Sequence, residues 1–357
     1  MSLQILSIQT TQTSFSNFSQ LSKLRESNTL GAICFVDSTA GDSVTLNNDM
    51  PTIQLHTPIL DGLDTACEVW TLSTSKTPVT GSFESIKYRI NDEFLFGVIT
   101  LPESLLLKNK NNVPELQLIT ESAYRQIFAL MDEMDYPHIY RFWNYMADIN
   151  GVSHGLERYR QFNIGRKNAF LTSSNTTNSQ LPAACALGTA NGPLSIAFLL
   201  GRKAPVAIEN PRQVSAYEYP EDYGPKTPSF SRATLLRLEH SAILFISGTA
   251  SIVGHQTLHT TDVVAQTSET LANLEAVIAE ANNTIGKVEF NLRNVFLRVY
   301  IRHAADVSLV RNEIHRHLGD ATKAVFIQAD ICRQELLLEI EATAESVSTP
   351  ANLEPQS

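Results

Sequence analysis

The sequence has few cysteines, a deficit of basic residues and no long apolar run. Its 357 residues include only four cysteines, and 27 lysines and arginines stand against 37 aspartates and glutamates, which gives a formal net charge of −10. This acidic balance argues against nucleic acid or an anionic membrane as the main partner. No apolar run reaches the roughly 18 residues that a membrane span requires. A local group of arginines can still bind a small anionic ligand.

The cysteines Cys34, Cys67, Cys185 and Cys332 are scattered, with no CxxC pair and no regular spacing. Residues 1–19 are rich in serine, threonine and glutamine, and they lack the basic start of a signal peptide. Both features predict a protein of the reducing cytoplasm rather than a disulfide framework.

Several motifs of cofactor and hydrolase chemistry are also missing. The sequence contains no Walker A, GxGxxG, GxSxG or HExxH pattern. His315 and His317 are two residues apart on an expected helix, so their side chains point to different faces, which is poor spacing for a metal site. We therefore expect no metal and no organic cofactor.

The length and a composition of 43% hydrophobic and 18% charged residues suit a soluble protein of two domains or one duplicated domain. Residues 1–30 are polar, and we expect them to be irregular. Strands are predicted at 30–36 and 66–72. An amphipathic helix is predicted from Thr120, as its cap, to Met134.

The order of predicted elements is repeated in the second half of the chain, with a period of roughly 150 residues. The matching segments are 94–100 with 242–251, 120–134 with 267–281, 139–146 with 295–301, 155–161 with 306–318, 181–186 with 325–330, and 194–198 with 338–341. We predict an α/β (α+β) fold of two related halves, each a mixed β-sheet packed with helices. The predicted divisions are residues 1–204, 205–345 and a disordered tail at 346–357.

One charged centre lies in the stretch Leu336–Ala342, which we interpret as a mostly buried strand. Alternation puts Leu337, Glu339 and Glu341 on one face and Leu338, Ile340 and Ala342 on the other. A carboxylate among leucines loses hydration, so it is paired, or has a raised pKa, or both. Two interpretations stay open, a structural partner of an arginine and a proton donor at neutral pH. The first half has Ser-Ile-Ala at 195–197 in place of Glu-Ile-Glu, which predicts a single site per chain.

Arginines and tyrosines supply the other candidates. Arg158 and Arg311 occupy matching positions of two predicted helices, and paired arginines can hold two carboxylates, although a surface role is the alternative. Residues 210–233 combine tyrosine, arginine and proline, as in a ligand-binding loop or a packed connector. The candidates in that loop are Arg212, Tyr217, Tyr219 and Arg232. Cys332 has two interpretations, a small buried apolar residue or a nucleophile, and the sequence shows no histidine that would activate the thiol.

The C-terminal half resembles the small trimeric YjgF/RidA family. The matching segments are Phe245–Gly248, 267–281, Val299–Asp306 and Glu339–Ala342. The resemblance implies that residues 1–204 are a degenerate domain of this kind and that residues 205–345 are the copy that carries the acid. The arginine that this family has before its final strand is missing at 322–325, so we do not expect imine hydrolysis.

Nearly the whole chain resembles the chorismatase family, which cleaves the enolpyruvyl ether of chorismate and releases pyruvate. The matching motifs are Tyr140–Tyr145, Pro211–Tyr217, Tyr223–Pro225, Pro228–Ala233, Ser247–Gly254 and Ala329–Arg333. Gly248 and Cys332 are similar to the branch that forms 3-hydroxybenzoate. The alternatives are the hydrolytic branch, which gives a dihydroxycyclohexadiene carboxylate, mixed 3- and 4-hydroxybenzoate formation, and a binding module without catalysis.

The chorismatase resemblance implies a role for each candidate. Glu339 would protonate the enolpyruvyl methylene, with Cys332 beside it, and Gly248 and Cys332 would shape the pocket so that the 4-hydroxyl of the substrate, rather than water, completes the reaction. The residues expected to hold substrate are Arg158, Arg311, Arg212, Arg232, Tyr217 and Tyr219. Chorismate is the expected partner, without nucleic acid, membrane, metal or cofactor, and the expected assembly is a monomer or a trimer.

Overall fold

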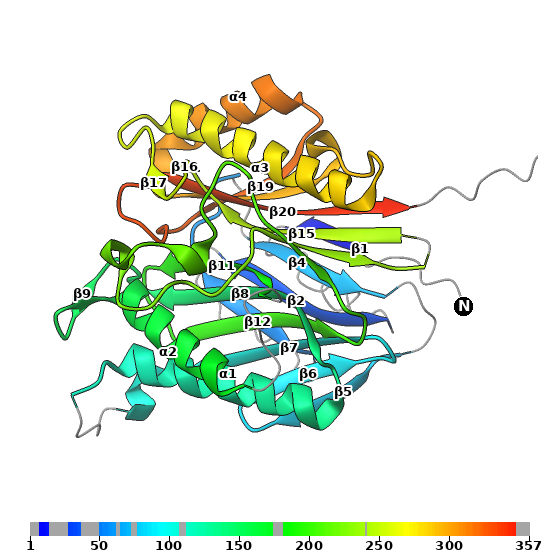
Figure 1. The fold of residues 1–357 in the computed structure, drawn as a ribbon, viewed down its shortest axis with the longest axis vertical. Helices are drawn as coiled ribbons and strands as arrows, with labels where there is room; N and C mark the ends of the chain where they lie inside the picture. The colour runs from blue at the N-terminus through cyan, green and yellow to red at the C-terminus, as the bar shows by residue number, and fades with distance from the viewer. Residues whose placement is uncertain are drawn as a thin grey trace, which may run out of the picture.

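The computed structural model describes most of the chain as three larger β-sheets, two short hairpins and four longer helices (Figure 1). The described residues are 7–13, 28–36, 50–61, 65–72, 77–106, 112–173, 181–239 and 241–347. Among the helices of these ranges, none combines the length and the apolar character needed to cross a membrane.

The first half of the duplication is a six-stranded sheet with two helices. Its strands are β5 (Val79–Phe83), β6 (Ile86–Ile90), β7 (Phe94–Leu101), β8 (His138–Ala147), β11 (Ala183–Thr189) and β12 (Leu194–Gly201). Its helices are α1 (Glu115–Met134) and α2 (Arg158–Thr172), and the short hairpin of β9 (Val152–Ser153) and β10 (Leu156–Glu157) precedes α2. The spatial order is β11-β8-β12-β7-β6-β5.

The second half repeats this arrangement. Its strands are β13 (Val206–Ile208), β14 (Ala233–Arg237), β15 (Ser241–Thr249), β18 (Phe296–Ile301), β19 (Lys323–Gln328) and β20 (Leu338–Val347). Its helices are α3 (Val263–Ile285) and α4 (Val307–Leu318), and β16 (Ile252–Val253) pairs with β17 (Gln256–Thr257). The order β19-β18-β20-β15-β14-β13 is that of the first sheet, with the corresponding parallel pairs β8/β11 and β18/β19. The predicted duplication is confirmed.

A third sheet precedes both halves. It contains β1 (Ser7–Thr13), β2 (Thr29–Val36), β3 (Thr52–His56) and β4 (Thr65–Thr71) in the order β1-β4-β2-β3. The prediction of an irregular start is therefore wrong for β1, because this polar segment pairs along its whole length with β4.

The prediction of scattered, unpaired cysteines is also wrong for two of them. Cys34 of β2 lies opposite Cys67 of β4, and the two residues form a disulfide with their Cα atoms 4.1 Å apart. The bond depends on the register of two strands whose cysteines are separated by 33 residues in sequence, and cysteine spacing alone does not reveal that register.

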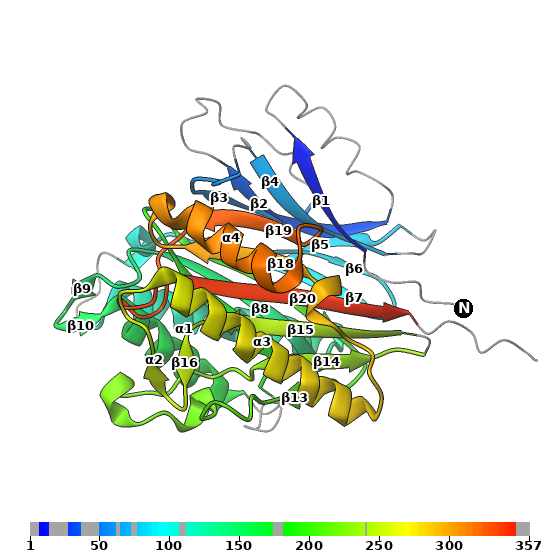
Figure 2. The same cartoon turned by 90° about the horizontal axis from the view of Figure 1, so that it is seen from above.

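The two larger sheets face each other, and the helices cover their outer faces (Figure 1). Figure 2 shows the third sheet beside them. The three sheets share one core, since the ring of Phe35 in β2 lies 6.1 Å from Tyr145 in β8 and 6.3 Å from Tyr300 in β18, centroid to centroid. A separate core under each helix pair holds α1 and α2, or α3 and α4, to its own sheet.

Both helices of the first half differ from their predicted bounds. Helix α1 begins at Glu115, after Pro114, so Thr120 is not a cap but a fully buried residue of the second turn. Helix α2 begins at Arg158 and continues to Thr172, well beyond the predicted end at 161. Its buried face includes polar side chains such as that of Arg166, which obscure the apolar periodicity on which the prediction depended.

Strand β20 has the predicted alternation at its centre. Leu338, Ile340 and Ala342 pack in the core beneath α3 and α4. Glu339 and Glu341 lie on the other face and are only 4% exposed. Leu337 precedes the strand and packs with the helix-side core instead. The strand continues to Val347, beyond the predicted start of the tail, and residues 348–357 lie outside the described residues.

Candidate active site

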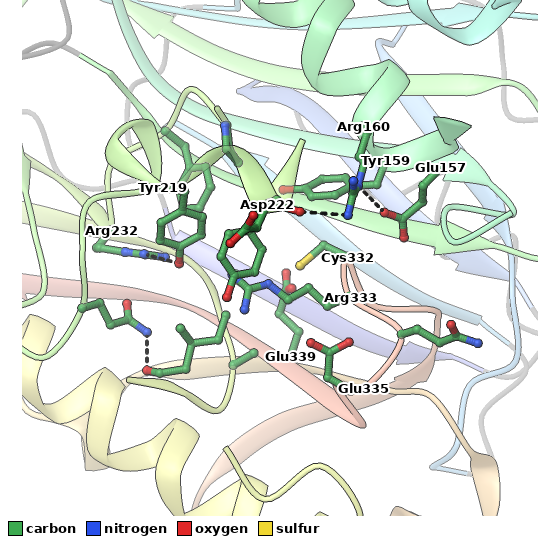
Figure 3. Close-up of a pocket in the computed structure, with 18 residues that line it drawn as sticks. Glu157, Tyr159, Arg160, Tyr219, Asp222, Arg232, Cys332, Arg333, Glu335 and Glu339 are labelled. Atoms are coloured by element: carbon green, nitrogen blue, oxygen red, sulfur yellow. Dashed lines mark hydrogen bonds and ion pairs between the residues drawn. The ribbon is translucent and has the colours of Figure 1, made fainter. Parts of the chain in front are cut away.

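A cavity of about 300 Å³ lies between the two halves (Figure 3). The start of α2, in the first half, forms one wall of the cavity. The second half forms the other walls through the loop between β13 and β14, the end of β15, and β20 with the loop before it. The lining residues are Glu157, Tyr159, Arg160, Gln213, Tyr219, Asp222, Tyr223, Pro228, Phe230, Arg232, Gly248, Ala250, Ile252, Cys332, Arg333, Gln334, Glu335 and Glu339. Neither half can form this site alone.

Glu339 is a buried acid of this cavity. Its Oε1 atom has no hydrogen-bond partner among the described residues. Burial raises the pKa of Glu339 to about 8, the negative charge of Glu341 adds to this effect, and the guanidinium of Arg141 opposes it. The carboxyl is therefore protonated at neutral pH and can donate a proton into the cavity.

Gly248 has no side chain, and the carboxyl of Glu339 occupies the space where one would lie. It lies where the pairing of β15 with β20 shifts register between Ile246 and Thr249. A Cβ atom placed on Gly248 would overlap Oε1 of Glu339, and it would lie 3.2 Å from the Cβ atom of Cys185. A side chain at this position would thus displace the acid.

Cys332 lines the cavity as a neutral thiol. Burial raises its pKa to about 12, and the nearby Glu339 contributes in the same direction. Burial likewise raises the pKa of Tyr159, with the adjacent Cys332 as a further cause. A thiol that stays protonated is a poor nucleophile, so this environment fits a role in shaping the cavity.

Three guanidinium groups lie around the cavity (Figure 3). Arg232 is 5% exposed, and its Nη2 donates to the hydroxyl of Tyr219 at 2.8 Å. Arg333 lies over the ring of Tyr223, 4.0 Å from its centroid, and its buried Nη2 has no hydrogen-bond partner in the described part of the chain. Arg160 donates to the backbone oxygen of Asp222 at 3.2 Å. These cations suit an anionic ligand.

Five of the predicted site residues meet at this cavity, and four do not. Glu339, Cys332, Gly248, Tyr219 and Arg232 line it. The side chain of Tyr217 packs instead against the core between α1, α2 and their sheet.

The other three arginines have partners elsewhere. Arg158 donates to the carbonyl oxygen of Ala147 at 2.9 Å and pairs with Glu103. Arg311 pairs with Asp61 at 2.5 Å, and Arg212 pairs with Glu269 and donates to Asn273. The predicted equivalence of Arg158 and Arg311 is wrong, because they are the first residue of α2 and the fifth of α4.

Sequence reasoning missed Arg333, Arg160, Tyr159 and Tyr223. Arg333 directly follows Cys332 in one of the matched motifs, which was the available signal. Tyr159 and Arg160 directly follow Arg158, and only the orientation of α2 decides which of these neighbours reaches the cavity.

Comparison with known proteins places the chain in a family. The family model "Chorismatase FkbO/Hyg5-like, N-terminal" matches residues 68–200, and the model "Endoribonuclease L-PSP" matches residues 227–346. The second match supports the resemblance of the C-terminal half to the YjgF/RidA fold.

Individual relatives match over most of their length. A 3-hydroxybenzoate synthase of Streptomyces hygroscopicus is 32% identical over 325 residues, which cover 88% of this chain and 91% of the relative. A chorismatase of Streptomyces rapamycinicus is 33% identical over 314 residues, covering 85% and 89%. The crystal structure of a chorismatase superposes with a TM-score of 0.82 at 31% identity, over 96% of this chain and 99% of that one. The chain therefore belongs to the chorismatase family.

Proposed function

We propose that this chain is an enzyme that converts chorismate to 3-hydroxybenzoate and pyruvate. The observation that carries the proposal is the carboxyl of Glu339, which is protonated at neutral pH and has one unpartnered oxygen in a cavity with three arginines. Membership of the chorismatase family, with a 3-hydroxybenzoate synthase among its relatives, names the substrate and the product.

The proposed reaction begins with proton transfer from Glu339 to the methylene carbon of the enolpyruvyl group. The electron pair of the double bond forms the new C–H bond, and the neighbouring ether carbon becomes positively charged. This charge weakens the bond between the ether oxygen and the ring. The 4-hydroxyl oxygen then bonds to ring carbon 3 as the bond from that carbon to the ether oxygen breaks, pyruvate leaves with the electron pair of the broken bond, and the hydroxyl proton returns to Glu339. The resulting epoxide opens by cleavage of its bond to ring carbon 4, and the ring becomes aromatic as carbon 3 loses its hydrogen as a proton and the oxygen gains one. No water is consumed.

Arginines are the proposed ligands of the two substrate carboxylates. Arg333 has a buried donor without a partner among the described residues, and Arg232 and Arg160 add two guanidinium groups to a lining that also holds the acids Glu157, Asp222 and Glu335. Arginine binds carboxylates through two parallel hydrogen bonds, so such contacts would orient the ring relative to Glu339. Gly248 and Cys332 are proposed to hold the substrate so that its own hydroxyl, rather than water, reacts.

Incubation of the purified protein with chorismate, without added metal or cofactor, tests the proposal. Chromatography should reveal 3-hydroxybenzoate and an equal amount of pyruvate, and Glu339→Gln should abolish both. A dihydroxycyclohexadiene carboxylate would instead identify the hydrolytic reaction, and 4-hydroxybenzoate would identify the mixed one. If chorismate stabilised the protein against heat without release of pyruvate, the proposed enzymatic function would be contradicted, and a binding module would be indicated.

The division at residues 204 and 205, a cytoplasmic location, and a monomeric or trimeric state stay predictions. Gel filtration with light scattering tests the assembly. The cavity between the halves is formed within one chain, which favours a monomer as the active unit.

A further inference from the structure

A buried ion cluster lies directly beside Glu339, on the same face of β20. Its centre is Glu341, which accepts hydrogen bonds from Nη1 of Arg298 at 2.6 Å and from the hydroxyl of Tyr300 at 2.8 Å. The other carboxylate oxygen of Glu341 pairs with Nη2 of Arg141. Both oxygens of Glu341 are thus paired, whereas Oε1 of Glu339 has no partner among the described residues.

The cluster is assembled from all three sheets. Arg141 comes from β8, Arg298 and Glu341 come from neighbouring strands of the second half, and Glu68 of β4 pairs with Arg298. Each of these four residues is at most 6% exposed. Two buried arginines therefore match two buried glutamates, and no cation of this cluster is left for Glu339.

The carboxyl groups of Glu339 and Glu341 consequently differ in charge. Burial by itself would raise the pKa of Glu341, but Arg298 and Arg141 outweigh burial, so the pKa lies below its ordinary value. Arg141 has no donor directed at Glu339 among its described hydrogen bonds, because Nη1 donates to the backbone oxygen of Ile246 at 2.7 Å. Two neighbouring carboxyl groups in a dry site do not both ionise readily when only one of them is paired.

We infer that Glu341, held ionised by its two arginines, is a positioning residue that keeps the neighbouring Glu339 in its neutral acid form. This inference rests on the proposed role of Glu339 as proton donor. The cluster thereby links the acid to the packing of the three sheets, since its members come from β4, β8, β18 and β20.

Three further titratable groups near Glu339 are neutral. Cys332 lies in the loop before β20, Cys185 lies on β11, and Tyr159 lies on α2. Burial raises the pKa of each of these groups, and Glu339 itself is among the further causes. Charged side chains also line the cavity, namely Arg160, Arg232, Arg333, Glu157, Asp222 and Glu335. The charges that shift the pKa of Glu339 are those of Glu341 and, with opposite sign, Arg141.

The test compares Glu341→Gln with Glu68→Gln. Both changes remove one buried carboxylate from the same cluster, but only Glu341 lies beside Glu339. The first readout is the pH dependence of kcat for pyruvate release. In the wild type kcat should fall as the pH rises through about 8, and in Glu341→Gln this fall should move down by roughly one pH unit or more. In Glu68→Gln it should stay in place.

A second variant covers the case in which Glu341→Gln does not fold. The double variant Glu341→Gln/Arg141→Met removes one buried charge of each sign and keeps the pair of Arg298 with Glu68, and such exchanges are often tolerated. The effect of Glu341 exceeds that of Arg141, so the fall in kcat should move in the same direction as in the single variant, but by less.

An infrared titration separates this inference from the proposed function. The carbonyl band of a protonated carboxylic acid, assigned to Glu339 by its loss in Glu339→Gln, should persist at pH 7 and disappear near pH 8. Absence of pyruvate release in the wild type would reject the proposed function and still leave this titration to be measured. An unchanged titration in both Glu341 variants, or an equal shift in Glu68→Gln, would overturn the inference.

Discussion

Replacement of Gly248 by alanine adds one methyl group at the position where the carboxyl of Glu339 lies. The added Cβ would overlap Oε1 of Glu339. Gly248 does not have a left-handed φ, so alanine meets no backbone strain there and the overlap is the main cost. The carboxyl is the end of a flexible side chain and can swing aside. We expect Gly248→Ala to lower the free energy of unfolding by about 1–3 kcal/mol, as overpacking usually does.

Catalysis should suffer more than binding in Gly248→Ala. A displaced acid no longer points at the methylene carbon, and misplacement of a reacting group by about 1 Å can cost roughly 100-fold in rate. We therefore expect kcat to fall about tenfold to 100-fold, with a smaller change in KM, and hydrolytic product to increase. Pyruvate release and chromatography of the ring product measure both effects.

A double-mutant cycle identifies the cause. In the background Glu339→Ala the carboxyl is absent, so Gly248→Ala should cost less stability in urea unfolding, with a coupling energy of about 0.5–3 kcal/mol. Some cost should persist, because the added methyl group still lies 3.2 Å from the Cβ atom of Cys185. The reasoning is refuted if the two backgrounds give equal costs, or if Gly248→Ala keeps the wild-type kcat.

Three further predictions concern the acid, the arginines and the thiol. The raised pKa of Glu339 predicts that activity is present below about pH 8 and lost above it, and that Glu339→Gln reduces kcat about 100-fold or more. The control is Glu345→Gln, at a half-buried acid of β20 whose pKa is raised to about 7 and which does not line the cavity, and it should keep the wild-type pH profile. Arg333→Met should raise KM for chorismate, and Arg158→Met should lower the melting temperature without changing KM; a larger KM effect at Arg158 would contradict the assignment. Cys332→Ala should increase the share of hydrolytic product in chromatography, and an unchanged product ratio would remove the proposed role of the thiol.

Much of the site was predictable because the chain repeats itself. The two halves have the same order of strands and helices, so the substitution of Ser-Ile-Ala by Glu-Ile-Glu stood out in the sequence. Alternation along a strand predicts from the sequence alone that Glu339 and Glu341 lie on one face of β20. A buried acid must be either paired or neutral, and the sequence left both possibilities open.

Tertiary structure decided between them, because the partners come from distant strands. Glu341 pairs with Arg141 and Arg298, whereas within the described part of the chain no arginine pairs with Glu339, the acid that lines the cavity. The bond of Cys34 to Cys67 likewise depended on strand register, and the rotation of α2 about its axis turned Arg158 away from the cavity. Local periodicity determines which face of its own element a residue occupies. Only the packing of the three sheets determines what that face meets.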